Sequence, residues 1–268
     1  MTALAVHEET FGELLRSWRQ RRRVSQLDLA IEADVSSRHI SFLETGRANP
    51  SRDMVMRLAE ELDVPLRHRN RLLVAAGFAP AFREREVQAP EMGVVRQAID
   101  KILHAHNPYP AVVVDAAWNL VAANEAAMAF FGGSVSEELM KTDPVNVLRM
   151  TLHPDGMAAK LVNLAEVRAH LLQRLRRQAE ASGDGRLGEL HDELAGYTYP
   201  GVELNVAHVP GPGDILLPLR IRHGEMVLSM FTTIATFGSP LDVTVSELAI
   251  ETLWPADEAT AAVFNGGG

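Results

Sequence analysis

The sequence predicts two domains of different fold class: an N-terminal all-α domain of five helices and a C-terminal α+β domain with about five antiparallel strands. Residues 1–80 carry apolar side chains at the three- and four-residue spacing of helices. Two prolines then interrupt this pattern within a charged stretch, which places a linker at 81–92. Short β-branched runs follow and define the second domain at 93–262, and a flexible glycine-rich tail is expected at 263–268.

Three of the five helices flank the centre of the first domain. The first begins near Phe11 and carries an apolar face that includes Trp18. The fourth begins after Ser51, whose hydroxyl can accept a hydrogen bond from a free backbone N–H of the first turn. The fifth follows Pro65, and both of these last helices supply apolar side chains at helical spacing for a common core.

Residues 25–47 are expected to form the remaining two helices, joined by a tight turn. Ser25 can cap the first of them, together with the acidic residue three positions on, as a capping box. Ser36 or Ser37 can cap the second, and Gly46 can end it because glycine adopts the left-handed conformation of a helix terminus. This spacing resembles the helix-turn-helix of phage repressors and of the Xre family of bacterial regulators.

The resemblance covers all five helices in order, so it implies an Xre/repressor-like DNA-binding domain. In that motif the second helix lies in the major groove of double-stranded DNA, here an operator. A helical bundle that binds only proteins is the alternative interpretation of the same pattern.

By this resemblance Gln26 contacts a phosphate and braces the recognition helix. Arg38 can bind a guanine with two hydrogen bonds, and Phe42 can pack on a thymine methyl group; a dimer contact or a core position is the alternative for Phe42. The family pairs an acidic residue, here Glu44, with a basic residue of the first helix, here Arg19. The predicted DNA-binding residues are Gln26, Ser36, Ser37, Arg38, Ser41, Phe42, Arg47, Asn49 and Arg52.

Charge is distributed unevenly between the two domains. Residues 1–80 hold 12 Arg and 11 acidic residues, a net charge of +1, whereas residues 81–268 carry −10 of the overall −9. Phosphate neutralisation supplies most non-specific DNA affinity, so the acidic part is not expected to lie along DNA. One weakly positive N-terminal domain should bind poorly, which predicts a homodimer with recognition helices about 34 Å apart.

The second domain is expected to combine a sheet with helices packed on one side of it. A helix at 92–106 comes first, Asn124 caps a helix after the second strand, and a long helix is expected at 157–182. The expected strands lie at 111–115, 118–123, 215–221, 226–237 and 245–253.

Four segments of this domain resemble a known family. The pattern VDxxWNLVxxNEAA, from Val114 to Ala127, is similar to the opening of PAS sensor domains. The segments NVLRMTLHPDG at 146–156, RLGELHDEL at 186–194 and SELAIETLWPADEAT at 246–260 resemble the ligand-binding domain of MmyB/MltR-like regulators. That family joins an Xre-type DNA-binding domain to a PAS-like sensor, so the resemblance covers nearly the whole chain and implies a ligand-responsive bacterial transcription regulator.

The resemblance also implies a cavity between sheet and helices for an apolar small molecule, such as a fatty acid or a similar acyl compound. The predicted ligand-binding residues are Met128, Phe131, Leu148, Arg149, Met150, His153, Leu219, Leu228 and Met230. Arg149 and His153 are the candidates for a carboxylate head, although Arg149 can equally pair with a nearby acid. Two alternatives stay open: these side chains fill an ordinary core, and the domain binds a protein partner with no small-molecule ligand.

Other function classes find little support in the sequence. The chain has no cysteine, which excludes disulfides and iron–sulfur clusters, and no apolar run reaches the roughly 20 residues of a membrane span. The start lacks a secretion signal, so a soluble cytoplasmic protein is expected. His104 and His106 have no third metal ligand nearby, and no catalytic motif appears. We therefore expect no enzyme activity, metal or cofactor.

Overall fold

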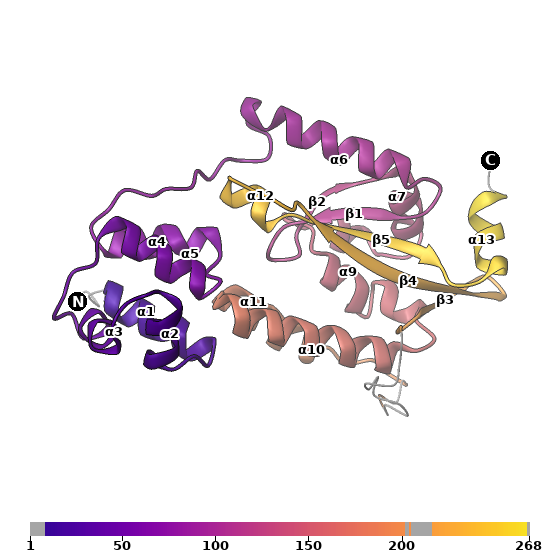
Figure 1. Ribbon diagram of the computed structural model, residues 1–268. Helices are drawn as coiled ribbons and strands as arrows, with labels where there is room; N and C mark the ends of the chain where they lie inside the picture. Colours follow the sequence, from indigo (N-terminus) through magenta and orange to yellow (C-terminus); the bar gives the residue numbers. More distant parts are fainter. Residues whose placement is uncertain (1–8, 202–203, 205–215, 267–268) are drawn as a thin grey trace, which may run out of the picture. The chain divides into compact units, whose positions relative to one another are not determined.

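The computed structural model describes residues 9–201, 204 and 216–266 of the chain. These residues form two compact units (Figure 1). The first unit comprises Met1–Arg85 and Ser239–Ser246, and the second comprises Glu86–Gly238 and Glu247–Gly268. The boundary near residue 85 falls inside the expected linker, whereas the assignment of 239–246 to the first unit has no counterpart in the sequence prediction.

The first unit confirms the predicted order of five helices. They are α1 Phe11–Arg21, α2 Gln26–Glu32, α3 Ser37–Glu44, α4 Arg52–Glu61 and α5 Leu66–Ala75. Side chains cap the first four at their N-terminal ends, each accepting from a backbone N–H three residues on: Thr10, Ser25, Ser36 and Ser51. The expected capping box is present, since Ser25 Oγ accepts from the backbone N of Asp28 at 3.1 Å.

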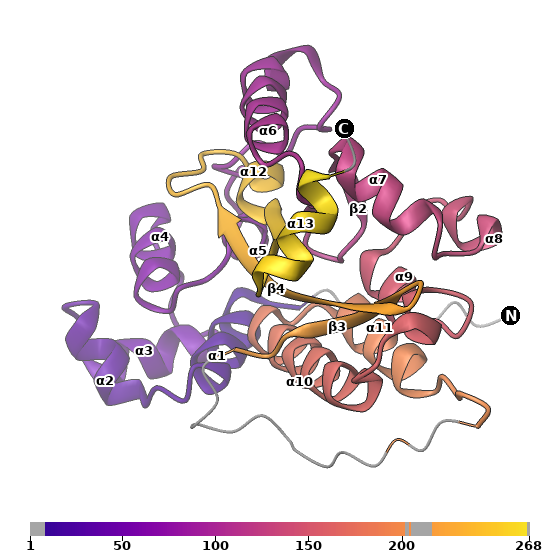
Figure 2. The same cartoon turned by 90° about the vertical axis from the view of Figure 1, so that its right-hand side faces the viewer.

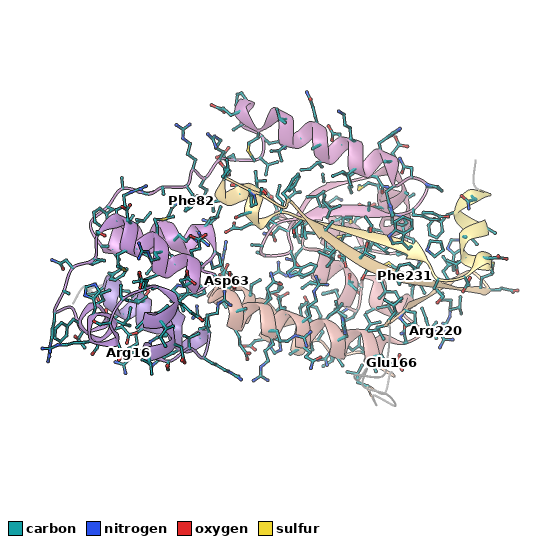
Figure 3. The ribbon with its side chains drawn as sticks, viewed as in Figure 1. Arg16, Asp63, Phe82, Glu166, Arg220 and Phe231 are labelled. Atoms are coloured by element: carbon teal, nitrogen blue, oxygen red, sulfur yellow. The ribbon has the colours of Figure 1, made fainter. Side chains whose placement is uncertain are left out.

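Buried leucine, isoleucine and valine side chains from all five helices form one core. Helix α1 approaches α3 closely, because a Cβ added at Gly12 would lie 2.7 Å from the backbone oxygens of both Leu43 and Glu44. Arg22 ties the end of α1 to the end of α4, donating to the carbonyl oxygens of Leu62 at 2.8 Å and of Asp63 at 2.6 Å (Asp63 is labelled in Figure 3). Helix α1 is thus packed closely against α3 and hydrogen-bonded to the end of α4.

The second unit is an α+β domain, as predicted. Its strands are β1 Ala111–Val114, β2 Leu120–Ala123, β3 Leu219–His223, β4 Met226–Thr236 and β5 Ala249–Pro255. Its helices are α6 Gly93–Ala105, α7 Glu125–Gly132, α8 Glu137–Met140, α9 Val147–Leu152, α10 Leu164–Ser182, α11 Gly185–Ala195, α12 Val243–Glu247 and α13 Glu258–Asn265, with 3₁₀ turns at Pro90–Met92 and Met157–Lys160.

The five strands form one antiparallel sheet in the order β2-β1-β5-β4-β3. Helix α6 covers one face, where Ile99 and Leu103 pack with Val113 and Ile250. Helices α9, α10 and α11 lie on the opposite face, as Figures 1 and 2 both show, and form the larger core there. The expectation that helices pack on one side only is therefore wrong: α6 buries the apolar side chains of the second face.

The segment expected as one helix at 157–182 is divided. A 3₁₀ turn ends at Lys160, and α10 begins only at Leu164. Between them Leu161 pairs with Ile221 of β3, and the backbone N of Val162 donates to the carbonyl oxygen of Arg220 at 2.7 Å. Hydrogen bonds to a distant strand thus replace the helical bonds that local periodicity predicted.

The last expected strand, at 245–253, is likewise displaced. Helix α12 occupies its first residues because Asp242 accepts a hydrogen bond from the backbone N of Thr244 at 3.0 Å, and β5 starts at Ala249. Strand β3 lies within the expected range only from residue 219, and residue 215 is outside the described residues. Helix α13 extends into the expected tail as far as Asn265.

The connection from β4 to β5 is bonded to the segment that follows the helical domain. Arg83 forms a parallel bridge with Asp242, and its carbonyl oxygen accepts from the backbone N of Val243 at 2.8 Å. The guanidinium of Arg85 pairs with Asp242 at 2.6 Å, and the carbonyl oxygen of Arg85 accepts from the Thr244 hydroxyl at 2.6 Å. We call these five residues the linker clamp; they explain why 239–246 belongs to the first unit.

Candidate DNA-binding surface and ligand cavity

The outer face of α3 presents polar and cationic side chains around one aromatic ring. Ser37 and Arg38 are exposed, whereas Ile40 and Leu43 of the same helix are buried. The ring of Phe42 is half-buried and lies between two guanidinium groups, with the Arg38 carbon 5.1 Å and the Arg47 carbon 5.9 Å from its centroid. A cation over the face of an aromatic ring is attracted by the ring quadrupole. Arg38 and Arg47 therefore hold two positive charges beside the Phe42 ring on this surface.

A buried charge network fixes the end of α3. The Glu44 carboxylate accepts from Arg19 Nε at 2.5 Å and from Arg19 Nη2 at 2.9 Å, and Gln26 Nε2 donates to it at 2.7 Å. Burial raises the pKa of Glu44, but the bonds from Arg19 and Gln26 outweigh burial and hold that pKa below its ordinary value. The charge of Arg16, labelled in Figure 3, acts in the same direction.

The remaining predicted DNA-binding residues border the same surface. Gln26 starts α2 and is bonded to Glu44, which is the bracing role that the resemblance implies; its phosphate contact stays a prediction. Ser36 caps α3, and Ser41 lies one turn before its end. Arg47, Asn49 and Arg52 are exposed in the turn after α3 and at the start of α4.

The second unit contains a partly open cavity of about 260 Å³ on the α10 side of its sheet. Its walls come from β1, β3, β4 and β5 and from α7, α9 and α10, and Phe231 on β4 is labelled in Figure 3. Most of the lining is apolar: Val112, Phe130, Phe131, Val147, Leu148, Met157, Leu161, Val167, Leu171, Leu216, Leu217, Leu219, Ile221, Phe231 and Leu253. Thr151, Thr232, His170, Arg174 and Glu251 supply the polar groups.

The predicted apolar ligand residues divide into three groups in the structure. Phe131, Leu148 and Leu219 line the cavity. Met150, Leu228 and Met230 are fully buried in packed side chains and do not line it. Met128 is 48% exposed on α7 and does not line it either.

The two polar candidates lie together outside the cavity. Arg149 binds Glu193 of α11 through two hydrogen bonds of 2.8 and 2.7 Å, and the hydroxyl of Tyr197 donates to the same carboxylate. The bond to Glu193 raises the pKa of Arg149, and the bond to Arg149 lowers that of Glu193. His153 packs edge-on against Tyr197 at 5.0 Å and lies 3.8 Å from Asp155. Arg149 thus has the local acid partner that the sequence left as an alternative.

Instead, β5 and α10 supply the ionisable groups of the cavity. Glu251 comes from β5, and His170 and Arg174 lie one turn apart on α10. The Arg174 guanidinium carbon sits 4.4 Å from the ring centroid of Trp118, whose indole N–H donates to Gln178. Burial raises the pKa of Glu251, although the charge of Arg174 opposes this.

Burial also lowers the pKa values of His170 and Arg174. Sequence reasoning missed these groups, yet a signal exists. His170 and Arg174 lie within the apolar stripe of a helix that includes Val167 and Leu171, and Glu251 shares a sheet face with Leu253. Charges at positions whose periodicity predicts burial mark them as candidates for a functional site.

Three comparisons with known proteins cover both units. A family model described as "MmyB-like transcription regulator ligand binding domain" matches residues 95–265, and a model described as "Helix-turn-helix domain" matches residues 10–72. Among curated proteins, the "Uncharacterized HTH-type transcriptional regulator RghRB" of Bacillus subtilis (strain 168) is 37% identical over 82 residues, which are 30% of this chain. The chain spans 57% of the length of that relative. Within the described ranges, no helix combines the length and the apolar character needed to cross a membrane.

Proposed function

Because the chain belongs to the MmyB-like transcription regulator family, we propose that it binds operator DNA as a homodimer and that an apolar small molecule in the 260 Å³ cavity controls this binding. The cavity is the observation that carries the proposal. A domain that only docks a protein partner needs no apolar hollow beneath its surface, whereas a ligand pocket is an apolar hollow with a few placed polar groups.

DNA binding is supported by the way α3 is presented. Its outer face carries Arg38 and Phe42, and its inner face is fixed by Ile40, Leu43 and the network around Glu44. A recognition helix must hold its side chains in register with base edges, so a rigid helix with an exposed cationic and aromatic face is suited to the major groove.

Arg38→Ala tests whether this face reads bases. The cognate site is first selected from a random duplex library with the wild-type protein, and affinities for it and for random DNA are then compared. Loss of a two-bond contact to guanine costs about 1–3 kcal/mol, which is roughly 5- to 150-fold in Kd on the selected site. Arg71→Ala, at an exposed position of α5, is the matched control. Equal losses on both DNAs would make Arg38 a phosphate contact.

A homodimer is proposed because one N-terminal domain carries little net positive charge. Two copies double the phosphate contacts, and each contact adds to the salt-dependent affinity. We expect a palindromic operator whose half-sites are about one helical turn apart, or about 34 Å. Sedimentation of the protein with one-site and two-site duplexes measures this: one bound copy on a full operator would contradict the dimer.

For the ligand we propose an acyl compound, of which a fatty acid is the simplest example. At roughly 30 Å³ for each water-sized group, the cavity corresponds to a chain of about nine such groups. Native mass spectrometry of the purified protein, followed by solvent extraction, tests this directly. Leu148→Trp should fill the cavity and release a co-purifying chain, and a compound retained by that variant would not be a cavity ligand.

The proposed control of DNA binding is a population shift between dimer geometries that match or do not match the half-sites. Strands β4 and β5 line the cavity, and their connection contains the linker clamp residues Asp242, Val243 and Thr244. A ligand that moves these strands therefore has a hydrogen-bonded route to residues 83–85, where the helical domain leads into the linker.

A further inference from the structure

The cavity lining includes a carboxyl group and a guanidinium group that are not hydrogen-bonded to the described part of the protein. Neither Glu251 nor Arg174 makes a side-chain hydrogen bond or ion pair with any residue in the described part of the chain. Arg174 is stacked on Trp118 instead, at 4.4 Å. Glu251 and Arg174 act on each other electrostatically but share no hydrogen bond, so both keep hydrogen-bonding capacity that a ligand can use.

The neighbours of Glu251 in the sheet offer its side chain no hydrogen-bond partner. In the sheet its residue pairs with Val112 of β1 on one side and with Ile234 of β4 on the other, and both side chains are apolar. From α10 the cationic group that acts on it is Arg174, and His170 lies one turn earlier along the same helix. The only charges that face the carboxyl group among these elements therefore come from α10.

The two groups require different hydrogen-bonding partners in a ligand. A guanidinium has five donors and no acceptor, whereas an ionised carboxylate only accepts hydrogen bonds. A bare carboxylate head satisfies Arg174 but places a second negative charge beside Glu251, which must then take up a proton. A carboxamide head offers an oxygen to Arg174 and an N–H to an ionised Glu251, and it adds no charge beside either group.

We propose that Glu251 and Arg174 together select the head group of the ligand: the cavity takes an acyl chain that ends in an uncharged group with a hydrogen-bond donor beside an acceptor, such as a carboxamide, in preference to a bare carboxylate. The inference rests on the proposed ligand-binding function and narrows its ligand class. Burial already raises the pKa of Glu251, so a bound carboxylate would raise it further, and carboxylate binding would weaken as the pH rises.

Two probes of equal length test this proposal: decanoate and decanamide, titrated calorimetrically into the full-length protein at pH 8. Wild-type protein should bind decanamide at least tenfold more tightly. Glu251→Gln removes the negative charge but keeps the size, so it should improve decanoate binding tenfold or more and thereby reduce the preference. The matched control is Glu180→Gln on α10, where the side chain is 65% exposed and pairs with Arg176; it should change neither affinity.

A second measurement needs no variant and covers the case in which Glu251→Gln does not fold. Repeating the wild-type titrations in buffers of different ionisation enthalpy reports the protons exchanged on binding. Decanoate binding should take up more protons at pH 8 than decanamide binding. Equal affinities with no proton uptake would overturn the head-group inference and leave a ligand cavity in place. Binding of neither probe would instead count against the proposed acyl ligand itself.

Discussion

Replacing Arg19 by methionine should destabilise the helical unit far more than its position near the surface suggests. Methionine keeps the apolar stem of the side chain but removes both donors to Glu44, together with the Arg19 Nη1 bond to the carbonyl oxygen of Val24 at 3.0 Å. The carboxylate side chain is 2% exposed and would retain only the bond from Gln26, at 2.7 Å. A buried charge without its partner is then the dominant change.

The magnitude follows from that burial. Breaking a buried ion pair by removing one partner costs about 3–5 kcal/mol, because the remaining charge stays desolvated. The Arg19 side chain is 12% exposed, and Gln26 keeps one bond to the carboxylate, so we expect the lower end, about 3 kcal/mol. Where exchange is limited by cooperative opening, this corresponds to about a hundredfold faster hydrogen exchange.

Hydrogen exchange of the full-length protein, read by mass spectrometry on peptides that cover α1 and α3, measures this change for the helical unit alone. Arg71→Met is the matched control, since Arg71 and Glu9 form a pair with side chains 53% and 51% exposed, and exposed pairs contribute about 0–1 kcal/mol. The double variant Arg19→Met with Glu44→Leu should recover most of the loss, because no buried charge remains.

If Arg19→Met accelerated exchange no more than Arg71→Met, the network around Glu44 would not be what fixes α3. Failure of the double variant to recover stability would instead locate the loss in packing around the Arg19 stem or in its hydrogen bond to Val24, and the reasoning from the buried charge would be wrong in that case too.

Three further outcomes are expected. The pKa of Glu44 is depressed in the folded state, so the stabilisation that its charge provides is present above the ordinary glutamate pKa of about 4.3 and is lost as the pH falls through the depressed value. Acid titration followed by circular dichroism should therefore show the helical unit unfolding at low pH. Gly12→Ala should lower the melting temperature of that unit, because overpacking against α3 costs about 1–3 kcal/mol and outweighs the roughly 1 kcal/mol gained in helix propensity. A higher melting temperature would refute the close approach of α1 and α3. Asp242→Ala removes a charged hydrogen bond worth about 1.5–3 kcal/mol and should speed hydrogen exchange at residues 83–85 and 243–247 tenfold or more. Unchanged hydrogen exchange would mean that the linker clamp holds without the Asp242 carboxylate.

The helical unit could be predicted closely because its signals are local. Ser25, Ser36 and Ser51 cap helices through bonds to backbone groups three residues away, so a short window of sequence contains the whole interaction. The pairing of Arg19 with Glu44 was available only through the family resemblance, since 25 residues separate the two. The resemblance itself is confirmed by the two family models.

In the second unit the errors come from long-range contacts. Periodicity predicts helix through Leu161 and Val162, but β3 offers them hydrogen bonds that a local pattern does not contain. The same limit applies to the ligand site. The sequence around Arg149 predicts a polar group beside apolar ones, but in the fold Glu193 of α11 pairs with it. Glu251 and Arg174 line one cavity because α10 packs on the face of the sheet that contains β5. In both pairs the partners come from different segments of the chain, so a local sequence pattern does not predict either pairing.

The linker clamp bears on how regulators of this design can be recombined. Arg85 and Asp242 are 157 positions apart in the chain, so the junction between the DNA-binding and sensor halves has two parts. A chimera joined at the linker alone would place a foreign Arg85 segment against the native 239–246 connection, or the reverse. Grafts that exchange operator specificity between relatives, whether by design or by gene fusion, should therefore succeed when the β4–β5 connection is inherited together with the helical domain.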